Sequence, residues 1–289
     1  MGFRFSRPNT TSKPIKLVNL MCQHKIEYFF HAHFNAQRGF YFDAVSEIVP
    51  GVFSAGSSII EDPYWNYCFL SNSRNIESLE LKQLESHLPV KGRELSFLLP
   101  SDHALEREDW FQEKYQEFSG DTWMVAKRSQ LNLENLLPGL VLQEIGDQRS
   151  IEMACQVFND AYLSVSEDGV GYSGLPPAYT NAFRLGLQRS ESFGSVHLLG
   201  TSDGNPVAVA SCFFAGRSAG IYNVAVSRFA RKQGFGTSIS KSIVAHGARF
   251  GIDDFFLQTE PESKVQEMYA RIGFKVLTRG KLFSPIVRA

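Results

Sequence analysis

The sequence predicts an α+β protein in which a mixed, largely antiparallel sheet is flanked by helices. Short runs of β-branched and aromatic residues, such as 221–226, are interleaved with segments such as 150–163 whose apolar residues recur at helical spacing. A hairpin signal, Asp203-Gly204-Asn205, separates two of the apolar runs. At 289 residues, the chain is long for one compact unit. We therefore expect two domains, 1–130 and 140–289, joined by a polar linker at 131–139.

Composition narrows the function classes. A hydrophobic fraction of 43% supports real cores, and a formal net charge of −1 gives no basic footprint for nucleic acid or an anionic membrane. The sequence contains no uninterrupted apolar window of about 18 residues, the length of a membrane-spanning helix, and its first 20 residues are too polar for a secretory signal. Four cysteines without a Cys-x-x-Cys pair indicate reduced thiols. We expect a cytoplasmic protein with no nucleic-acid or membrane partner.

The N-terminal half begins with a polar lead-in over 1–15 and an aromatic-rich segment over 18–42. His24, His31 and His33 in that segment are interpreted as structural, because two histidines two residues apart do not share a helix face and no third ligand type stands nearby. The pattern then predicts paired strands in 47–72, a helix at 78–87, a strand at 94–99, a charged helix at 104–118 and a strand at 122–127.

The C-terminal half follows the linker with a strand at 140–145 and an amphipathic helix at 150–163. Glycines and a Pro-Pro pair make 164–177 irregular, and 178–190 is helical. The hairpin comes next, with strands at 195–199 and 207–214, and a further turn leads to the strand 221–226.

The segment after that strand has the physical features of a phosphate-binding turn. Residues 231–236 read Arg-x-x-Gly-x-Gly, and apolar residues at helical spacing continue from Ile239 to Phe250. Backbone N–H groups at the start of a helix, together with the helix dipole, attract phosphate. Neither the dinucleotide fingerprint nor the P-loop pattern is present.

These residues resemble the GNAT superfamily of N-acetyltransferases over roughly the last half of the chain. The stretch 226–236 is similar to that family's acyl-CoA-binding signature, a strand ending in Val followed by Arg/Gln-x-x-Gly-x-Gly/Ala. The family's closing order of strand, tyrosine helix and Gly-Phe pair recurs at 255–259, 265–269 and 272–274. Two positions depart from the family pattern: Lys232 stands where Gly is frequent, and Glu262 where Asn commonly begins the tyrosine helix.

The resemblance implies the GNAT fold for 140–289 and acetyl-CoA, or another acyl-CoA, as cosubstrate without a metal. The strand would bind the pantetheine arm and the thioester carbonyl, and the turn would bind the pyrophosphate. The implied cofactor-binding residues are Val224, Ala225, Val226, Arg231, Lys232, Gln233, Gly234, Phe235, Gly236 and Thr237.

The resemblance also implies roles in catalysis and substrate binding. Tyr269 occupies the position of the family's general acid, and Tyr172 and Asn223 are expected to contact substrate. Glu260, at the end of a strand, is the first candidate for the general base because a carboxylate in a cleft accepts a proton through water. Weaker candidates for the base are Asp253, Asp254 and His197, while Cys212 and His246 are interpreted as structural.

A short internal similarity links the two halves. Residues 111–115 align with 265–269 at an offset of 154, sharing Gln, Glu and Tyr. The N-terminal half is therefore either a degenerate second GNAT-like copy or an unrelated α+β cap, and both interpretations stay open. Because the first half lacks Arg-x-x-Gly-x-Gly, a second copy would shape the substrate cleft rather than bind pyrophosphate.

The sequence thus predicts an N-acyltransferase, with acetyl as the favoured group, acting on a primary amine by direct attack in a ternary complex. A longer acyl chain stays open, and the small-molecule or peptide acceptor is not specified. A non-catalytic acyl-CoA-binding sensor is the alternative from another class. Related tandem folds that take aminoacyl groups from tRNA are disfavoured by the intact turn and the lack of basic excess.

Overall fold

The computed structural model describes residues 13–49, 51–70, 84–85, 88, 90–101, 103–165, 172–190 and 194–286. The N-terminal half contains α1 (Lys13–Gln37), β1 (Ala44–Val49), β2 (Val52–Gly56), η1 (Pro63–Trp65), β3 (Asn66–Leu70), β4 (Phe97–Pro100), η2 (Ala104–Arg107), α3 (Asp109–Gln112), β5 (Tyr115–Lys127) and η3 (Arg128–Gln130).

The C-terminal half contains β6 (Val141–Glu144), α4 (Gln148–Tyr162), β7 (Ser164–Val165), β8 (Tyr172–Ser173), α5 (Pro177–Gln188), β9 (Ser195–Ser202), β10 (Asn205–Ala215) and β11 (Ser218–Val226). It continues with η5 (Arg228–Ala230), α6 (Phe235–Arg249), β12 (Asp254–Thr259), α7 (Lys264–Ile272) and β13 (Lys275–Pro285). None of the described helices combines the length and the apolar character needed to cross a membrane.

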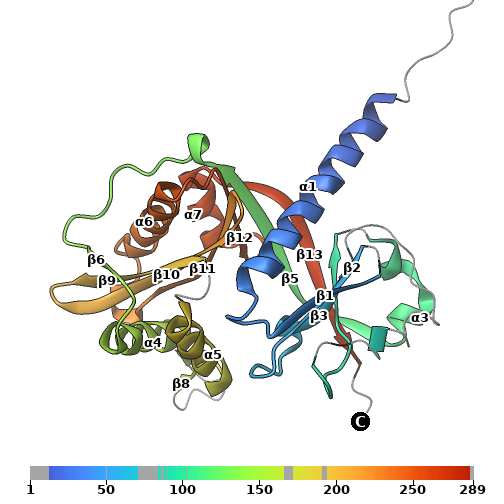
Figure 1. Ribbon diagram of the computed structural model, residues 1–289, viewed down its shortest axis with the longest axis horizontal. Coiled ribbons are helices and arrows are strands. Elements are labelled where there is room, and N and C mark those ends of the chain that lie inside the picture. Colours follow the sequence, from blue (N-terminus) through green and yellow to red (C-terminus); the bar gives the residue numbers. More distant parts are fainter. Residues whose placement is uncertain are drawn as a thin grey trace, which may run out of the picture.

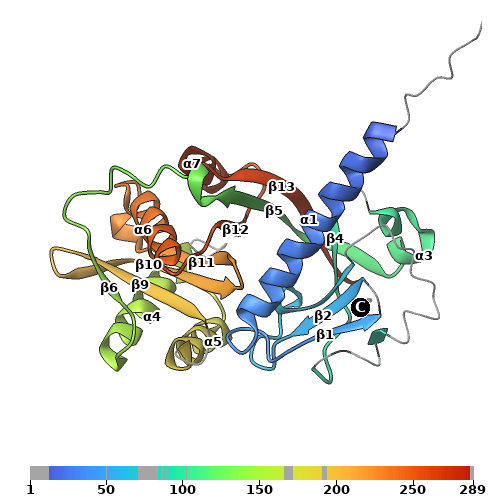
Figure 2. The same ribbon diagram turned by 45° about the horizontal axis from the view of Figure 1, so that its top comes forward.

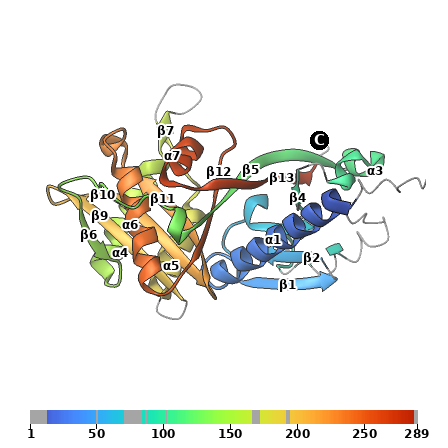
Figure 3. The same cartoon turned by 90° about the horizontal axis from the view of Figure 1, so that it is seen from above.

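One sheet runs through both halves. Among the described residues it holds 11 strands in the order β1-β2-β3-β4-β13-β5-β12-β11-β10-β9-β6 (Figure 1). The long strands β5 and β13 exchange places: β5 pairs antiparallel with β12 and β13, and β13 pairs antiparallel with β4 and β5. Seen from above, these two strands join the halves (Figure 3). The predicted boundary near 131–139 therefore does not divide the sheet into two separate sheets.

The strand order has an approximate internal repeat. The run β2-β3-β4-β13 matches the run β10-β11-β12-β5, and in each run the two middle strands are the parallel pair. The repeat is not the one expected from the 154-residue offset, because Tyr115 opens β5 whereas Tyr269 lies inside α7. The counterpart of Tyr115 is Lys275, which opens β13. The strand topology supports a degenerate second copy over an unrelated cap.

Side chains alternate between the two faces of β5, so this one strand contributes residues to two cores. Trp123 and Val125 pack in the cluster beneath α1, whereas Met124 and Ala126 pack in the cluster beneath α6 and α7. Successive side chains of a strand point to opposite faces of the sheet, so this period of two buries both sides of β5.

Helices cover both faces of the C-terminal half of the sheet. Helix α6 lies on one face, and α4 and α5 lie on the other (Figure 2). The core beneath α6 includes Ile239 and Ile243, one turn apart, and the opposite core beneath α4 and α5 includes Phe158 and Phe183. Phe40, from the N-terminal half, packs in that second core. Because the cores contain residues of both halves, the halves are not packed independently.

The sequence predictions for the N-terminal half need several corrections. The sequence pattern does not identify 18–42 as helical, yet most of it lies in α1. Phe29, Phe30 and Phe34 of α1 are buried in one core, whereas Phe40 and Tyr41, after the end of the helix, are buried in another. Because the aromatic residues of the segment serve two cores, they do not form a simple amphipathic stripe. The predicted helix 104–118 is wrong: two short helical turns lead into β5, since Tyr115 and its successors pair with β13. Most of the predicted helix 78–87 lies outside the described residues.

The sequence predictions for the C-terminal half agree more closely with the structure. Helices α4 and α5 and the β9–β10 hairpin are confirmed, with Asp203 and Gly204 both at positive φ in its turn. Within 164–177, predicted to be irregular, β7 and β8 form a separate two-stranded pair. The linker 131–139 has no helix or strand but packs along α6, where Ser238 Oγ accepts from Leu137 N at 2.9 Å and Lys241 Nζ donates to Glu134 O at 2.6 Å.

Candidate active site

A bulge in β11 opens the sheet. Asn223 has φ 54°, in the left-handed region, and the β10–β11 register shifts at this point, with Val209 opposite Ala225 and Ser211 opposite Tyr222. Strand β11 pairs with β12 only from Ser218–Asp254 to Gly220–Phe256, before the bulge. Beyond these residues no pairing holds the two parallel strands together, so a ligand can reach the backbone of β11.

A cleft of about 840 Å³ occupies this opening. The C-terminal half contributes β11, the end of β12, α4, α5 and α7, and the N-terminal half contributes three aromatic residues. We call this space the main cleft; its lining comprises Tyr41, Tyr64, Trp65, Phe158, Ala161, Tyr162, Leu175, Tyr179, Ile221, Tyr222, Asn223, Val224, Ala225, Val226, Arg231, Gly236, Gln258, Thr259, Glu260, Val265, Met268 and Tyr269.

The predicted phosphate-binding turn leads from β11 to α6. Gly234 caps the helix with φ 91°, a conformation that favours glycine, and Lys232 has φ 61°. The left-handed geometry accounts for the preference for Gly at the position of Lys232. The first N–H groups of α6 lack intrahelical acceptors by the geometry of a helix, and Gly236 in this first turn lines the main cleft.

Gly236 is not required by packing within the protein. A Cβ built at this position would lie 3.6 Å from Val226 Cγ2 and 3.7 Å from Met268 Sδ, which are ordinary van der Waals contacts. The absent side chain instead leaves room between β11 and α7, where a ligand can approach the backbone.

The structure brings together many of the predicted site residues. The main cleft is lined by Asn223, Val224, Ala225, Val226, Arg231, Gly236, Glu260 and Tyr269. Lys232, Gln233 and Gly234 belong to the adjoining turn, and Phe235 and Thr237 lie in the first turn of α6; none of the five is in the lining. The side chain of Phe235 is buried in the core, which leaves only its backbone available. Tyr172 belongs to β8, and its side chain lies outside the described residues.

Tyr269 is a buried phenol at the wall of the main cleft. Burial raises its pKa to about 12, and a hydrogen bond with Ser240 partly opposes that rise. Ser240 Oγ itself donates to Gly236 O at 2.7 Å. Tyr269 is thus protonated at neutral pH and fixed relative to the turn, as a proton donor requires.

Among the carboxylates predicted as a base, Glu260 alone lines the main cleft, and it is exposed. Asp254 begins β12, at the end of the strand remote from Glu260, and Asp253 forms an ion pair with Arg217. His197 is buried, and burial lowers its pKa to about 3, so it is neutral at pH 7.

A hydrogen-bonded chain connects His197 to the bulge. His197 Nδ1 and Ser211 Oγ lie 2.8 Å apart, Asn223 Nδ2 donates to Ser211 Oγ at 3.0 Å, and Tyr41 Oη donates to Asn223 Oδ1 at 2.7 Å. Asn223 is thereby held by both halves of the protein. Its side-chain amide fixes the bulge, a role that the sequence did not reveal.

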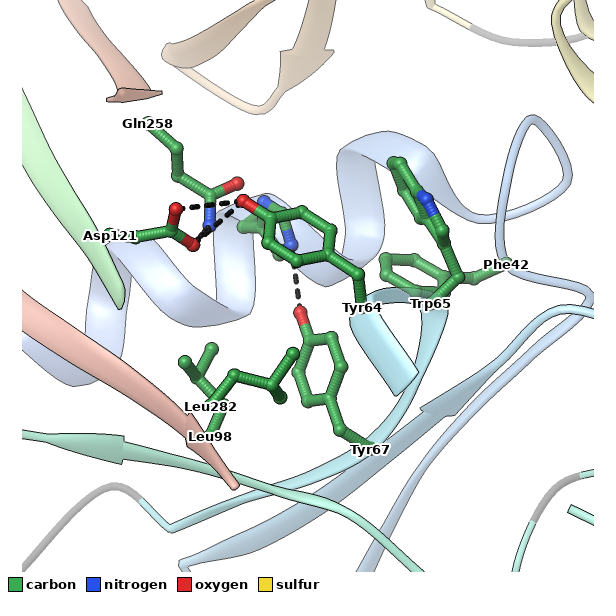
Figure 4. A pocket seen from close by; sticks show the side chains of 9 residues that line it. Phe42, Tyr64, Trp65, Tyr67, Leu98, Asp121, Gln258 and Leu282 are labelled. Carbon is green, nitrogen blue, oxygen red and sulfur yellow. Dashed lines mark hydrogen bonds between the residues drawn. The ribbon is translucent and has the colours of Figure 1, made fainter. Parts of the chain in front are cut away.

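A small chamber lies behind the main cleft, and sequence reasoning missed it entirely. It has a volume of about 10 Å³ and shares Tyr64, Trp65 and Gln258 with the main cleft. Asp121 on β5 is 8% exposed and accepts from Tyr64 Oη at 2.8 Å on each oxygen and from Gln258 Nε2 at 3.0 Å (Figure 4). The complete lining is His33, Phe42, Tyr64, Trp65, Tyr67, Leu98, Asp121, Gln258 and Leu282.

Burial dominates the electrostatics of this inner chamber. It raises the pKa of Asp121 to about 6, against the lowering effect of the hydrogen bonds from Tyr64 and Gln258. No cation bonds to the Asp121 carboxylate among the described residues. His33, at 2% exposed, bonds to Tyr222 and Tyr67, and burial lowers its pKa to about 3. His33 has the structural role predicted from the sequence.

The described residues contain no group of three or more His, Cys, Asp or Glu side chains arranged to hold a metal ion. The residues that fit a cofactor are instead the β11 backbone and the N-terminus of α6. Together they offer polar backbone groups along an apolar wall and N–H donors for an anion at its end.

Comparisons with known proteins agree with this geometry. Residues 159–274 match the model of the acetyltransferase (GNAT) family. A GCN5-related N-acetyltransferase from Kribbella flavida has the same fold at 12% identity and a TM-score of 0.64, covering 93% of this chain and 96% of its own.

Two further structures share the fold. One is a GCN5-related N-acetyltransferase from Sphaerobacter thermophilus, with 14% identity, a TM-score of 0.56 and coverage of 84% of this chain and 83% of its own. The other is a tandem GNAT protein from the clavulanic acid biosynthesis pathway, with 11% identity, a TM-score of 0.55 and coverage of 82% of this chain and 79% of its own. No curated protein matches this chain. Residues 159–274 therefore resemble the acetyltransferase (GNAT) family, within a chain that shares its overall fold with GCN5-related N-acetyltransferase structures.

Proposed function

We propose that this protein is an acyl-CoA-dependent N-acyltransferase that transfers acetyl from acetyl-CoA to a primary amine by direct attack in a ternary complex. The observation that carries the proposal is the main cleft itself, which connects the bulged strand β11 to the N-terminus of α6. A cleft of about 840 Å³ lies within the range of small-molecule sites. Acyl-CoA has a flexible arm suited to β11 and a pyrophosphate suited to the turn.

Each part of the site has a proposed task. The backbone of Val224, Ala225 and Val226 binds the pantetheine arm, and an N–H there polarises the thioester carbonyl. The N–H groups of 233–237, with Arg231 and Lys232, bind the pyrophosphate. The neutral amine attacks the carbonyl and loses one proton to a base, the C–S bond breaks, and Tyr269 gives its proton to the departing thiolate.

Acceptor recognition is assigned to the aromatic end of the main cleft. Tyr41, Tyr64 and Trp65 come from the N-terminal half, and Tyr179 adds a further ring from α5. The only Lys or Arg in the described lining is Arg231, at the turn. This combination fits a small-molecule or peptide amine with an apolar body. We also expect a reducing, cytoplasmic setting, which suits the free, buried thiols of Cys68, Cys155 and Cys212.

Titration calorimetry with acetyl-CoA and free CoA tests the binding half of the proposal. We expect micromolar binding that is lost in Gly236→Glu, because a carboxylate at the turn repels the pyrophosphate. Gly236→Ala should retain the fold, since its Cβ makes ordinary contacts. The matched control is Gly146→Glu, which adds the same acid at an exposed position where a Cβ meets nothing within 4 Å. A wild-type protein that binds neither CoA species would refute the proposal.

The non-catalytic sensor remains the alternative from another class. Both functions predict acyl-CoA binding, but only the transferase releases CoA thiol from acetyl-CoA when an amine is supplied. Thiol release with 2-phenylethylamine, tyramine, putrescine and L-lysine separates the two. Binding without release for every amine would favour the sensor.

A further inference from the structure

The inner chamber holds a buried carboxylate, Asp121, that the proposed mechanism leaves unused. Ionising a carboxylate away from water costs free energy unless a cation pairs with it. Asp121 has hydrogen bonds from Tyr64 and Gln258 instead of a cation. Titratable groups kept in such surroundings next to a cleft are frequently functional.

The chamber reaches the reacting end of the main cleft. Gly220 and Phe256 are the last paired residues of β11 and β12, and Tyr222 and Gln258 follow two positions later on the two strands. The hydrogen bond from Gln258 to Asp121 therefore lies where the strands begin to diverge. Tyr64 lines both the main cleft and the inner chamber. Its phenol donates to Asp121 (Figure 4), so Tyr64 connects Asp121 to the main cleft.

Tyr64 has a fixed orientation. Its backbone N–H donates to Asp62 Oδ1 at 2.8 Å, and Trp65 N donates to Asp62 O at 3.0 Å, which holds the η1 turn. Its hydroxyl proton is directed to the two Asp121 oxygens. The lone pairs of the phenolic oxygen are thus left to accept a hydrogen bond, and a reacting amine can donate one.

From this geometry we propose that Tyr64 and Asp121 form the proton-accepting relay for the acceptor amine, with Tyr64 touching the amine and Asp121 positioning Tyr64. The inference rests on the proposed function and deepens it. As the amine nitrogen bonds to the thioester carbon, the nitrogen becomes acidic and loses one proton to the Tyr64 oxygen. The Tyr64 hydroxyl proton moves at the same time to Asp121. After the C–S bond breaks, Tyr269 protonates the thiolate, and solvent then takes the proton from Asp121 and restores that of Tyr269.

The surroundings of Asp121 set its ionisation. Gly280 is its direct partner on β13, and the neighbouring cations Arg279 and Lys281 are paired with Glu262 and Glu106. Glu260 disfavours the charged form of Asp121, in the same direction as burial. The other polar or titratable groups that face Asp121 are Tyr64, Tyr67, Tyr222 and Gln258, with neutral His33 behind them. With a pKa of about 6, Asp121 is ionised at pH 7 and able to accept a proton.

The pH dependence of turnover tests the relay. Thiol release from acetyl-CoA is followed from pH 5 to pH 9 with the amine that turns over best among 2-phenylethylamine, tyramine, putrescine and L-lysine. The wild-type kcat should decrease as the pH drops below about 6, because Asp121 is then protonated. In Asp121→Asn that acid limb should disappear, and kcat at pH 8 should fall by roughly 10²-fold, the scale of one acid–base group. The KM for acetyl-CoA should stay within about twofold, because uniform binding is retained.

Two further variants separate the relay from a merely structural role. Tyr64→Phe should give the same fall in kcat, and the double variant should be no slower than either single one, since both residues act as a unit. Asp109→Asn, on the exposed first turn of α3, serves as the control and should keep the wild-type profile. An unchanged acid limb and kcat in Asp121→Asn, with an active wild type, would overturn the relay alone. A wild type that binds acetyl-CoA but acetylates no amine would overturn the transferase, and the relay with it.

Discussion

Tyr41 donates a hydrogen bond of 2.7 Å to Asn223, joining the N-terminal half to the bulge that opens the sheet. Asn223 tolerates its φ of 54° because asparagine adopts the left-handed region more readily than most residues. Two different physical effects therefore hold the bulge: backbone conformation and a hydrogen bond between halves.

Substitutions at Asn223 separate these effects. Asn223→Ala should lower the free energy of unfolding by roughly 2–3 kcal/mol, from left-handed strain and lost hydrogen bonds. Asn223→Gly should cost less, because glycine removes the strain while the hydrogen bonds are still lost. Urea unfolding of both variants provides the measurement. If Gly proves as costly as Ala, backbone strain at 223 has no part in the stability.

Tyr269→Phe tests the proposed acid. Thiol release should slow by about 10²-fold or more, whereas calorimetric affinity for acetyl-CoA should change little, because the ring still packs against Phe274. Tyr115→Phe is the matched control, since Tyr115 is also buried but lies outside the main cleft. Equal rates for Tyr269→Phe and wild type would remove Tyr269 from the mechanism.

The burial of His33 and His197 predicts that the folded protein loses stability in acid. Burial lowers the pKa values of His33 and His197 in the folded protein to about 3, from an ordinary value of 6.5. Between these values the unfolded chain binds more protons than the folded one, so stability falls as pH drops below 6.5. Each histidine contributes a slope of roughly 1.4 kcal/mol per pH unit in this window. The free energy of unfolding, measured with urea, should therefore be much lower at pH 5 than at pH 7.5. The double variant His33→Gln/His197→Gln should reduce this loss. The variant His31→Gln, at an exposed position, should leave the loss intact.

The raised pKa of Asp121 predicts that folding stability depends on pH with the opposite sign. Its pKa is raised from 3.8 to about 6, so the folded state binds more protons between those values and ionisation of Asp121 costs stability as pH rises. Relative to wild type, Asp121→Asn should gain roughly 3 kcal/mol between pH 4 and pH 7, from a shift of about two units. Unfolding curves of both proteins across this range give the difference, and a flat difference would mean that Asp121 titrates near its ordinary value.

The exchange of β5 and β13 predicts that each half depends on the other for stable folding. A fragment of residues 140–289 loses β5, which pairs with both β12 and β13 and contributes Met124 and Ala126 to the α6–α7 core. Such a fragment should be largely unfolded or aggregated by circular dichroism and size-exclusion chromatography. Co-expression with residues 1–139 should restore a soluble complex. A stable, monomeric fragment that binds acetyl-CoA would contradict the structural importance of β5.

The sequence by itself determined the parts of the site that are contiguous in the chain. The strand β11, the glycine turn, α6, α7 and Gly273-Phe274 depend on local alternation, glycine conformations and helical spacing, and their order carried the GNAT resemblance that the family match at 159–274 bears out. The same local signals located Tyr269 and Glu260, both of which line the main cleft.

Only the tertiary structure decided the exchange of β5 with β13, the burial of α1 and the meeting of Tyr64 with Asp121. Residues 64 and 121 lie on separate elements, and no local pattern indicates that a carboxylate on a strand will face a phenol from a distant turn. Strand pairing and burial depend on contacts between residues more than 100 positions apart, such as Val125 with Lys275, whereas secondary-structure patterns depend on neighbours a few residues away.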